Sequence, residues 1–216
     1  MLIPAYQAES TIGALVRSLR DLRIPVIVVD DASTDRTVQR ATEAGACVIR
    51  RPVNGGKGAA LKTGIAEALK EPSTQWVLMM DADRQHLPED IPLFFQERLR
   101  RTEADLFIGD RMHAPEGMPL DRQWTNRFMS ALLSFYSGQH IPDSQCGFRL
   151  ASRRLLERVR LRSNHFEIES ELILRAARAG FRIASVPVRC VYPSERVSFI
   201  LPFLDTLRFL RLLIQG

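Results

Sequence analysis

The chain has 216 residues, of which 45% are hydrophobic and 25% charged, a composition that fits one sizeable globular domain. Its formal charge of +5 suits an anionic small molecule, a lipid head group or an anionic membrane surface as a partner. Nucleic acid is not favoured, because no block of lysine and arginine interleaved with aromatic residues is present.

The first half of the chain alternates short apolar runs with helical patterns. The apolar runs predict strands at residues 1–5, 24–29, 46–49, 76–80 and 104–108. Between them, apolar residues recur with the helical period and predict helices at residues 10–19, 38–44, 59–69 and 87–100. This alternation predicts an α/β fold in which a mostly parallel, Rossmann-like sheet is flanked by helices.

The second half of the chain is more varied. Its pattern predicts a loop at residues 112–120, a glycine-containing strand or turn at 143–150, a strand at 183–192, and helices at 124–136, 152–159 and 166–179. We expect residues 1–196 to form one elaborated domain, followed by an amphipathic C-terminal segment at residues 197–216.

The strand predicted at residues 76–80 runs directly into Asp81-Ala82-Asp83. Ligands of open α/β sheets bind outside the carboxyl ends of the strands. Mg²⁺ in proteins typically takes one or two carboxylates together with substrate phosphates. The two aspartates therefore indicate a cation site, although a short aspartate-rich turn at a strand end is also common.

Two other loops follow predicted strands. Asp30-Asp31 could accept hydrogen bonds from a ribose hydroxyl or a base N–H, whereas Ser33 or Asp35 could equally cap the next helix. Residues 54–58, NGGKG, resemble a phosphate loop without the Walker A spacing. Lys57 would there offer a point charge to an anion, or the segment is a glycine-rich turn into a helix.

Six stretches in chain order resemble the family-2 glycosyltransferases of GT-A fold, and within them the dolichol-phosphate mannosyltransferase-like branch of polyprenyl-phosphate sugar synthases. The stretches are IPAYQAE at 3–9, VVDDASTD at 28–35, NGGKG at 54–58, DADRQHLPEDI at 81–91, GDR at 109–111 and DSQCGFR at 143–149. In the first of them Gln7 and Ala8 replace the Asn and Glu of the family pattern, and the missing carboxylate leaves the base preference open.

The resemblance implies roles for particular residues. A nucleotide-sugar pocket would include Pro4, Tyr6, Val29, Asp31, Lys57, Asp81 and Ala82. Mg²⁺ or Mn²⁺ would be held by Asp81, Asp83 and Gln85, and the acceptor phosphate by Arg111, Arg122 and Asn126. The implied donor is a nucleotide diphosphate sugar, and the implied reaction is metal-dependent and inverts the configuration of the sugar.

The acceptor decides which residues are catalytic. A polyprenyl (dolichyl or undecaprenyl) phosphate is already an anion and needs little or no general base, so Arg111 would stabilise charge. A sugar or glycan hydroxyl needs a carboxylate to take its proton, and Asp143 is then the candidate base. Asp143 could instead anchor the turn at residues 147–149.

Two other classes of protein fit less well. A sugar nucleotidyltransferase would require a glycine-rich basic loop after the first strand, where this chain has AYQAES. A non-catalytic nucleotide-sugar-binding module would not need Asp81, Asp83 and Arg111.

The C-terminal segment at residues 197–216 combines a broad apolar face with a narrow polar stripe. Its charges and Pro202 argue against a membrane span. It could lie on a membrane surface as an interfacial helix, or pack on the domain core or on a partner subunit in a homo-oligomer. Three widely separated cysteines indicate a reducing compartment, so we expect a cytoplasmic protein, peripheral on the cytoplasmic face of the membrane.

Overall fold

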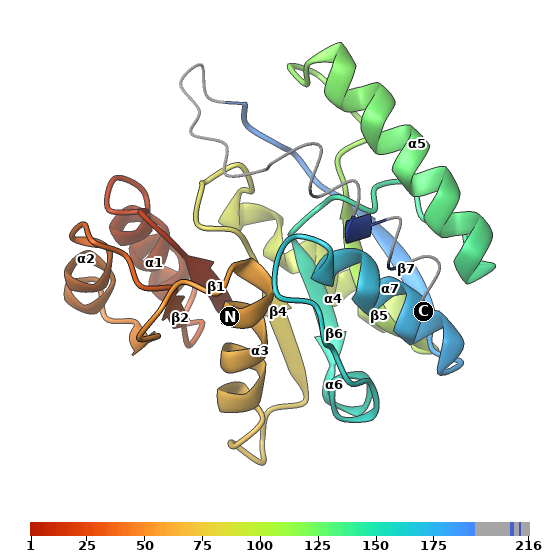
Figure 1. Cartoon of the computed structure of the whole chain (residues 1–216). Helices are drawn as coiled ribbons and strands as arrows, with labels where there is room; N and C mark the ends of the chain where they lie inside the picture. Colours follow the sequence, from red (N-terminus) through yellow and green to blue (C-terminus); the bar gives the residue numbers. More distant parts are fainter. Residues whose placement is uncertain (193–207, 210–211, 213–216) are drawn as a thin grey trace.

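The computed structural model describes residues 1–192, 208–209 and 212 (Figure 1). The predicted helix at 197–216, and the domain boundary before it, lie largely outside these residues and stay predictions. Within the described part of the chain, no helix is both long and apolar enough to cross a membrane.

Seven strands form one mostly parallel sheet, as predicted. They are β1 (Leu2–Ala5), β2 (Ile27–Asp30), β3 (Cys47–Arg50), β4 (Trp76–Met79), β5 (Ala104–Asp110), β6 (Arg149–Ser152) and β7 (Arg182–Pro187). Their order across the sheet is β3-β2-β1-β4-β6-β5-β7. Strand β6 is antiparallel to both of its neighbours, and the other pairs are parallel. The loop before β6 therefore lies at the same edge of the sheet as the loops that follow β1, β2, β4 and β5.

The helices agree with the predicted ones to within a few residues. They are α1 (Ile12–Asp21), α2 (Thr37–Glu43), α3 (Lys57–Ala68), the short 3₁₀ helix η1 (Pro88–Asp90), α4 (Ile91–Arg100), α5 (Leu120–Ser137), α6 (Arg153–Arg158) and α7 (Ile168–Arg178). Helix α3 packs on β1 and β2, while α4 packs on β5 and β7.

Two boundaries differ from the prediction. Helix α5 begins at Leu120 rather than at residue 124, and Asp121 in its first turn suits the positive end of the helix dipole. Strand β7 ends at Pro187 rather than at residue 192. The chain beyond it turns toward the loop that follows β4, where Cys190 forms an antiparallel bridge with His86.

Helix α3 approaches the sheet closely through Gly64, and this contact can be tested. In Gly64→Ala the new Cβ would lie 2.0 Å from Leu2 Cδ1 and 2.9 Å from Val29 Cγ2. Alanine favours a helix by up to about 1 kcal/mol over glycine, but overpacking a core costs about 1–3 kcal/mol. We expect Gly64→Ala to lower the free energy of unfolding, measured in urea. Gly13→Ala in α1 is the control, because there the nearest atoms lie at 3.5 Å. Equal stability of the two variants would contradict the prediction.

Candidate active site

The loops that follow β1, β2 and β4 share an unusual backbone feature. Gln7, Ala32 and Arg84 each have a positive φ, of 51°, 62° and 58° respectively, although none of them is glycine. Such a conformation costs about 1–3 kcal/mol per residue and tends to persist at functional sites. All three lie at the carboxyl edge of the sheet, where the sequence predicts the ligand.

The loops after β1 and β2 are joined by hydrogen bonds. The backbone N–H of Gln7 donates to Ser33 Oγ over 2.9 Å, and that of Ala8 donates to Thr37 Oγ1 over 2.8 Å. Two residues of the predicted nucleotide pocket, Pro4 and Tyr6, are partly exposed at this edge.

Val29 is also among the residues predicted to line the nucleotide pocket. It is 0% exposed and belongs to the hydrophobic core. It packs close to Gly64 of α3, so it supports the sheet beneath the pocket rather than the pocket surface.

Asp31 connects two motifs that are separate in the sequence. Its carboxylate accepts hydrogen bonds from the backbone N–H groups of Gly55 and Gly56, the latter at 2.7 Å, and pairs with Arg51. It therefore orients the glycine-rich loop. Neither Ser33 nor Asp35 is the N-cap residue of α2, which is Arg36, but Asp35 Oδ1 accepts from the Thr37 backbone N–H at the start of that helix.

The glycines of residues 54–58 allow close packing within the protein. Gly56 has a φ of 89°, and a Cβ at Gly58 would lie 2.7 Å from the carbonyl oxygen of Ser163. The backbone N–H of Ala59 donates to the carbonyl oxygen of Asn164 over 3.0 Å. This segment thus fixes the start of α3, and with it the position of Lys57.

Lys57 bridges two carboxylates. Its Nζ lies 2.6 Å from Asp81 Oδ1 and 2.7 Å from Glu169 Oε1, the latter from the first turn of α7. Burial alone would lower the pKa of Lys57, but the two carboxylates outweigh burial and hold that pKa above its usual value. The same contact holds the pKa of Asp81 low against the effect of burial. Gly147 leaves room for Asp81, since a Cβ there would lie 2.2 Å from Asp81 Oδ2.

Asp83 and Gln85 lie two residues further along the same loop. Asp83 is exposed, and its carboxylate accepts hydrogen bonds from the Gln85 backbone N–H at 3.0 Å and from the Gln85 side-chain amide. The loop is held from outside by Val191, whose N–H donates to the carbonyl oxygen of Gln85 over 2.9 Å.

These residues fit a divalent cation that is shared with a substrate. No cluster of three or more His, Cys, Asp or Glu side chains suited to a metal occurs among the described residues, so these residues alone supply no complete set of metal ligands. A Mg²⁺ site needs only one or two carboxylates when phosphates complete it. Asp81 already holds a cationic group, the Lys57 ammonium, and Asp83 adds a second carboxylate from the same loop.

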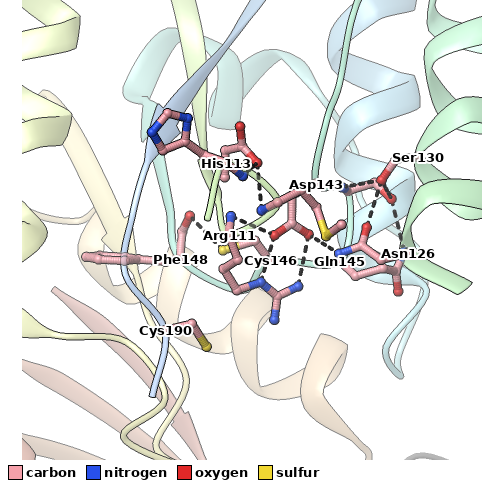
Figure 2. A network of polar contacts seen from close by, with 12 residues as sticks. Arg111, His113, Asn126, Ser130, Asp143, Gln145, Cys146, Phe148 and Cys190 are labelled. Carbon is pink, nitrogen blue, oxygen red and sulfur yellow. Dashed lines mark hydrogen bonds and ion pairs between the residues drawn. The ribbon is translucent and has the colours of Figure 1, made fainter. Parts of the chain in front are cut away.

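A second cluster surrounds Arg111, at the end of β5 (Figure 2). Its Nε and Nη2 donate to the two oxygens of Asp143 over 2.7 and 2.9 Å, and its backbone N–H donates to Asp143 over 3.0 Å. Asn126 of α5 donates to Asp143 Oδ1 over 2.6 Å, and Ser130 in turn donates to Asn126 over 2.9 Å. The structure thus brings together Arg111, Asp143 and Asn126, while Arg122 is exposed near the start of α5.

The environment of Asp143 makes its carboxylate a weak base. Burial would raise the pKa of Asp143, but hydrogen bonds from Arg111 and Asn126 hold it below its usual value. Both oxygens accept donors from the protein. Asp143 therefore orients the Arg111 guanidinium and leaves Nη1 directed away from the pair (Figure 2).

Arg149 anchors the turn before β6, a role that the sequence also allows for Asp143. The Arg149 side chain is almost fully buried. It donates to the carbonyl oxygens of Cys146 at 2.8 Å, Ser144 at 2.7 Å and Glu169 at 2.6 Å. The one sequence signal for this role is its position at the end of the motif at residues 143–149.

The fold and these loops together define the class of protein. A mostly parallel sheet flanked by helices, with its polar loops gathered at the carboxyl edge, is the GT-A fold of glycosyltransferases that use nucleotide sugars. Residues 1–160 match the model of glycosyl transferase family 2. The chain belongs to this family, and the protein is a glycosyltransferase.

Relatives and solved structures agree with this assignment. The chain is 28% identical to UDP-N-acetylglucosamine–dolichyl-phosphate N-acetylglucosaminyltransferase of Methanococcus voltae, over 89% of this chain and 85% of the relative. It is 26% identical to dolichol-phosphate mannosyltransferase of Pyrococcus furiosus, over 81% of this chain and 52% of the relative. Glucosyl-3-phosphoglycerate synthase of Mycobacterium tuberculosis, solved with Mn²⁺, uridine diphosphate and phosphoglyceric acid, superposes with a TM-score of 0.76 and 24% identity, over 99% of this chain and 76% of that one.

Proposed function

We propose that this glycosyltransferase moves a sugar, with inversion, from a nucleotide diphosphate sugar to a polyprenyl phosphate at the cytoplasmic face of a membrane. The observation that carries the proposal is the guanidinium of Arg111, whose side chain is only 12% exposed and which Asp143 holds in a fixed orientation. The Nη1 side of this fixed guanidinium, which lies outside the pair with Asp143, would offer a phosphate N–H donors and a permanent charge. The names of the two dolichyl-phosphate relatives point to the same acceptor class.

The state of Asp143 favours a phosphate acceptor over a hydroxyl. A hydroxyl acceptor needs a general base with a free oxygen and a pKa near the working pH. Asp143 has both oxygens engaged, and its pKa is held below the usual value. An acceptor phosphate is already charged and requires no such base.

On the donor side, Asp81, Asp83 and Gln85 would hold Mg²⁺ or Mn²⁺. The metal, when bound, would act as a Lewis acid toward the departing diphosphate. The protein's own part is to orient and to bind. Lys57 fixes Asp81 and adds positive charge, and the other donor contacts would come from Pro4, Tyr6, Asp31 and Ala82.

Inversion follows from a single displacement. Cys146 lies near Arg111 and Asp143, the cluster of residues proposed to bind the acceptor and called here the acceptor cluster (Figure 2). Cys146 is 0% exposed, and burial raises the pKa of its thiol. A buried neutral thiol is a poor nucleophile. Cys146 is therefore no candidate nucleophile, which fits a direct attack of the acceptor phosphate on the sugar.

The proposal is tested by a transfer screen with GDP-, UDP- and dTDP-sugars. Each donor is offered a polyprenyl phosphate in detergent, a free hexose or 3-phosphoglycerate, with Mg²⁺, with Mn²⁺ or with EDTA. We expect transfer to the polyprenyl phosphate and its loss in EDTA, because the departing diphosphate would lack its counter-ion. Transfer to a soluble hydroxyl acceptor, with none to the lipid, would overturn the proposed acceptor. Full activity in EDTA would overturn the metal.

A further inference from the structure

Helix α5 carries a stripe of exposed apolar side chains along one face. Leu120, Trp124, Phe128 and Phe135 follow one another at intervals of four, four and seven residues, so they share one face of the helix. Their exposed fractions are 72%, 69%, 65% and 81%. We call these four residues the α5 stripe. An apolar row of this kind on a surface helix indicates an interaction surface.

The opposite face of the same helix forms part of the acceptor cluster. Asn126 and Ser130 are buried there and lie in the hydrogen-bond network of Asp143 and Arg111 (Figure 2). Helix α5 lies at the edge of the molecule beside α7, outside the sheet (Figure 1). One helix thus places the apolar stripe and the proposed phosphate site on its two sides.

We propose that the α5 stripe inserts into the head-group region of a membrane that contains anionic lipid. An interfacial helix buries an apolar face about 5–10 Å into the bilayer boundary, and tryptophan is enriched at that depth. Arg127 is exposed on α5 next to Phe128, and the chain carries a net charge of +5, which favours an anionic surface. The inference rests on the proposed function, because a lipid-borne phosphate would then reach Arg111 while its chain stays in the bilayer.

The C-terminal segment is a weaker candidate for covering the stripe. Its described residue Phe209 is 3% exposed and lies in the same hydrophobic core as Leu133, which is on the buried face of α5. That residue is therefore buried in the core and does not lie over the exposed stripe. A second copy of the chain is the other candidate for covering the stripe, and the test below distinguishes it from a membrane.

The two tryptophans of the chain allow a direct test. Trp76 packs on Phe107 in the sheet, so Trp76→Phe keeps a ring there and leaves Trp124 as the sole tryptophan reporter. This variant is mixed with vesicles of phosphatidylcholine and phosphatidylglycerol, without donor or acceptor. We expect the emission of Trp124 to shift to the blue and to be quenched by brominated lipid.

The matched variants carry serine at exposed apolar positions. Phe128→Ser with Phe135→Ser should weaken vesicle binding roughly 10- to 100-fold. Leu99→Ser with Val53→Ser, at positions that are 67% and 65% exposed elsewhere on the molecule, should leave it unchanged. Equal binding by the two double variants, or an unshifted Trp124 emission, would overturn the proposal. A wild-type dimer in sedimentation that the stripe variant loses would assign the stripe to a second copy and also overturn it.

Transfer assays separate this inference from the proposed function. The stripe variant should keep its activity on a short-chain polyprenyl phosphate in detergent and lose it on the same acceptor in vesicles. Vesicle binding that depends on the stripe, without transfer to any polyprenyl phosphate, would refute the proposed acceptor. It would still support the proposal that the α5 stripe binds a membrane.

Discussion

Arg111→Lys is expected to lower kcat/KM for transfer to polyprenyl phosphate about 10²- to 10³-fold, the usual effect of removing one oriented donor from a charge-stabilising site. Lysine keeps a positive charge beside Asp143, so the buried carboxylate is not left unpaired and the fold should survive. It cannot reproduce the planar fork that donates through Nε and Nη2. Acceptor titrations at saturating donor measure the effect.

The control for this variant is Arg100→Lys, at an exposed position on α4 where Arg100 pairs only with the nearby Glu97 among the contacts described. Its transfer rate should match the wild type. Donor binding, followed by calorimetry with the nucleoside diphosphate, should be unchanged in Arg111→Lys. If donor binding and the free energy of unfolding fall together with transfer, Arg111 has a structural role and the acceptor assignment is wrong.

The layered α/β fold could be predicted because periodicity is local. The apolar runs at 76–80 and 104–108 contain enough information to place β4 and β5. The antiparallel direction of β6 was not predictable in this way, because it depends on pairing with two strands more than 40 residues away in sequence. Its sequence, Arg149 to Ser152, also begins with a charged residue, whose burial is compensated by hydrogen bonds to three carbonyl oxygens and by the Glu169 carboxylate.

The sequence motifs predicted which residues belong to the candidate site, but they did not predict the contacts that join one motif to another. The motifs located Asp31, Asp81 and Arg111 at the right edge of the sheet. The contacts that these side chains make could be identified only in the folded chain. The Asp31 carboxylate, for example, accepts a hydrogen bond from the backbone of the glycine-rich loop. Lys57 meets Glu169 across 112 positions. Such pairings depend on tertiary packing, which a residue pattern does not contain.

The α5 stripe shows the same limit. The helical period at residues 124–136 predicts a helix, but an amphipathic pattern does not say which side faces the core. Here the small polar residues Asn126 and Ser130 face inward. Asn126 donates to the Asp143 carboxylate, and Ser130 Oγ accepts from the Ser144 backbone N–H. The aromatic residues of the stripe face outward. The inner face of α5 thus combines polar residues that serve the buried charge pair with the apolar Leu133.

The Asp81→Asn variant is expected to lose about 10³-fold in transfer rate, which corresponds to about 4 kcal/mol of transition-state stabilisation. The amide keeps the shape of the carboxylate but removes the charge that would hold the cation and that now pairs with Lys57. Since Lys57 retains Glu169 as a partner, the protein should stay folded.

The measurement that isolates the metal is calorimetric binding of uridine or guanosine diphosphate with and without Mn²⁺. In the wild type, Mn²⁺ should strengthen binding, and in Asp81→Asn most of that gain should be lost. Asp21→Asn, at the exposed end of α1, is the control and should behave like the wild type. An unchanged Mn²⁺ effect in Asp81→Asn would remove Asp81 from the cation site. A loss of affinity by the same factor with and without Mn²⁺ would mean that Asp81 acts by positioning Lys57, because the loss of a metal ligand would weaken binding mainly when Mn²⁺ is present.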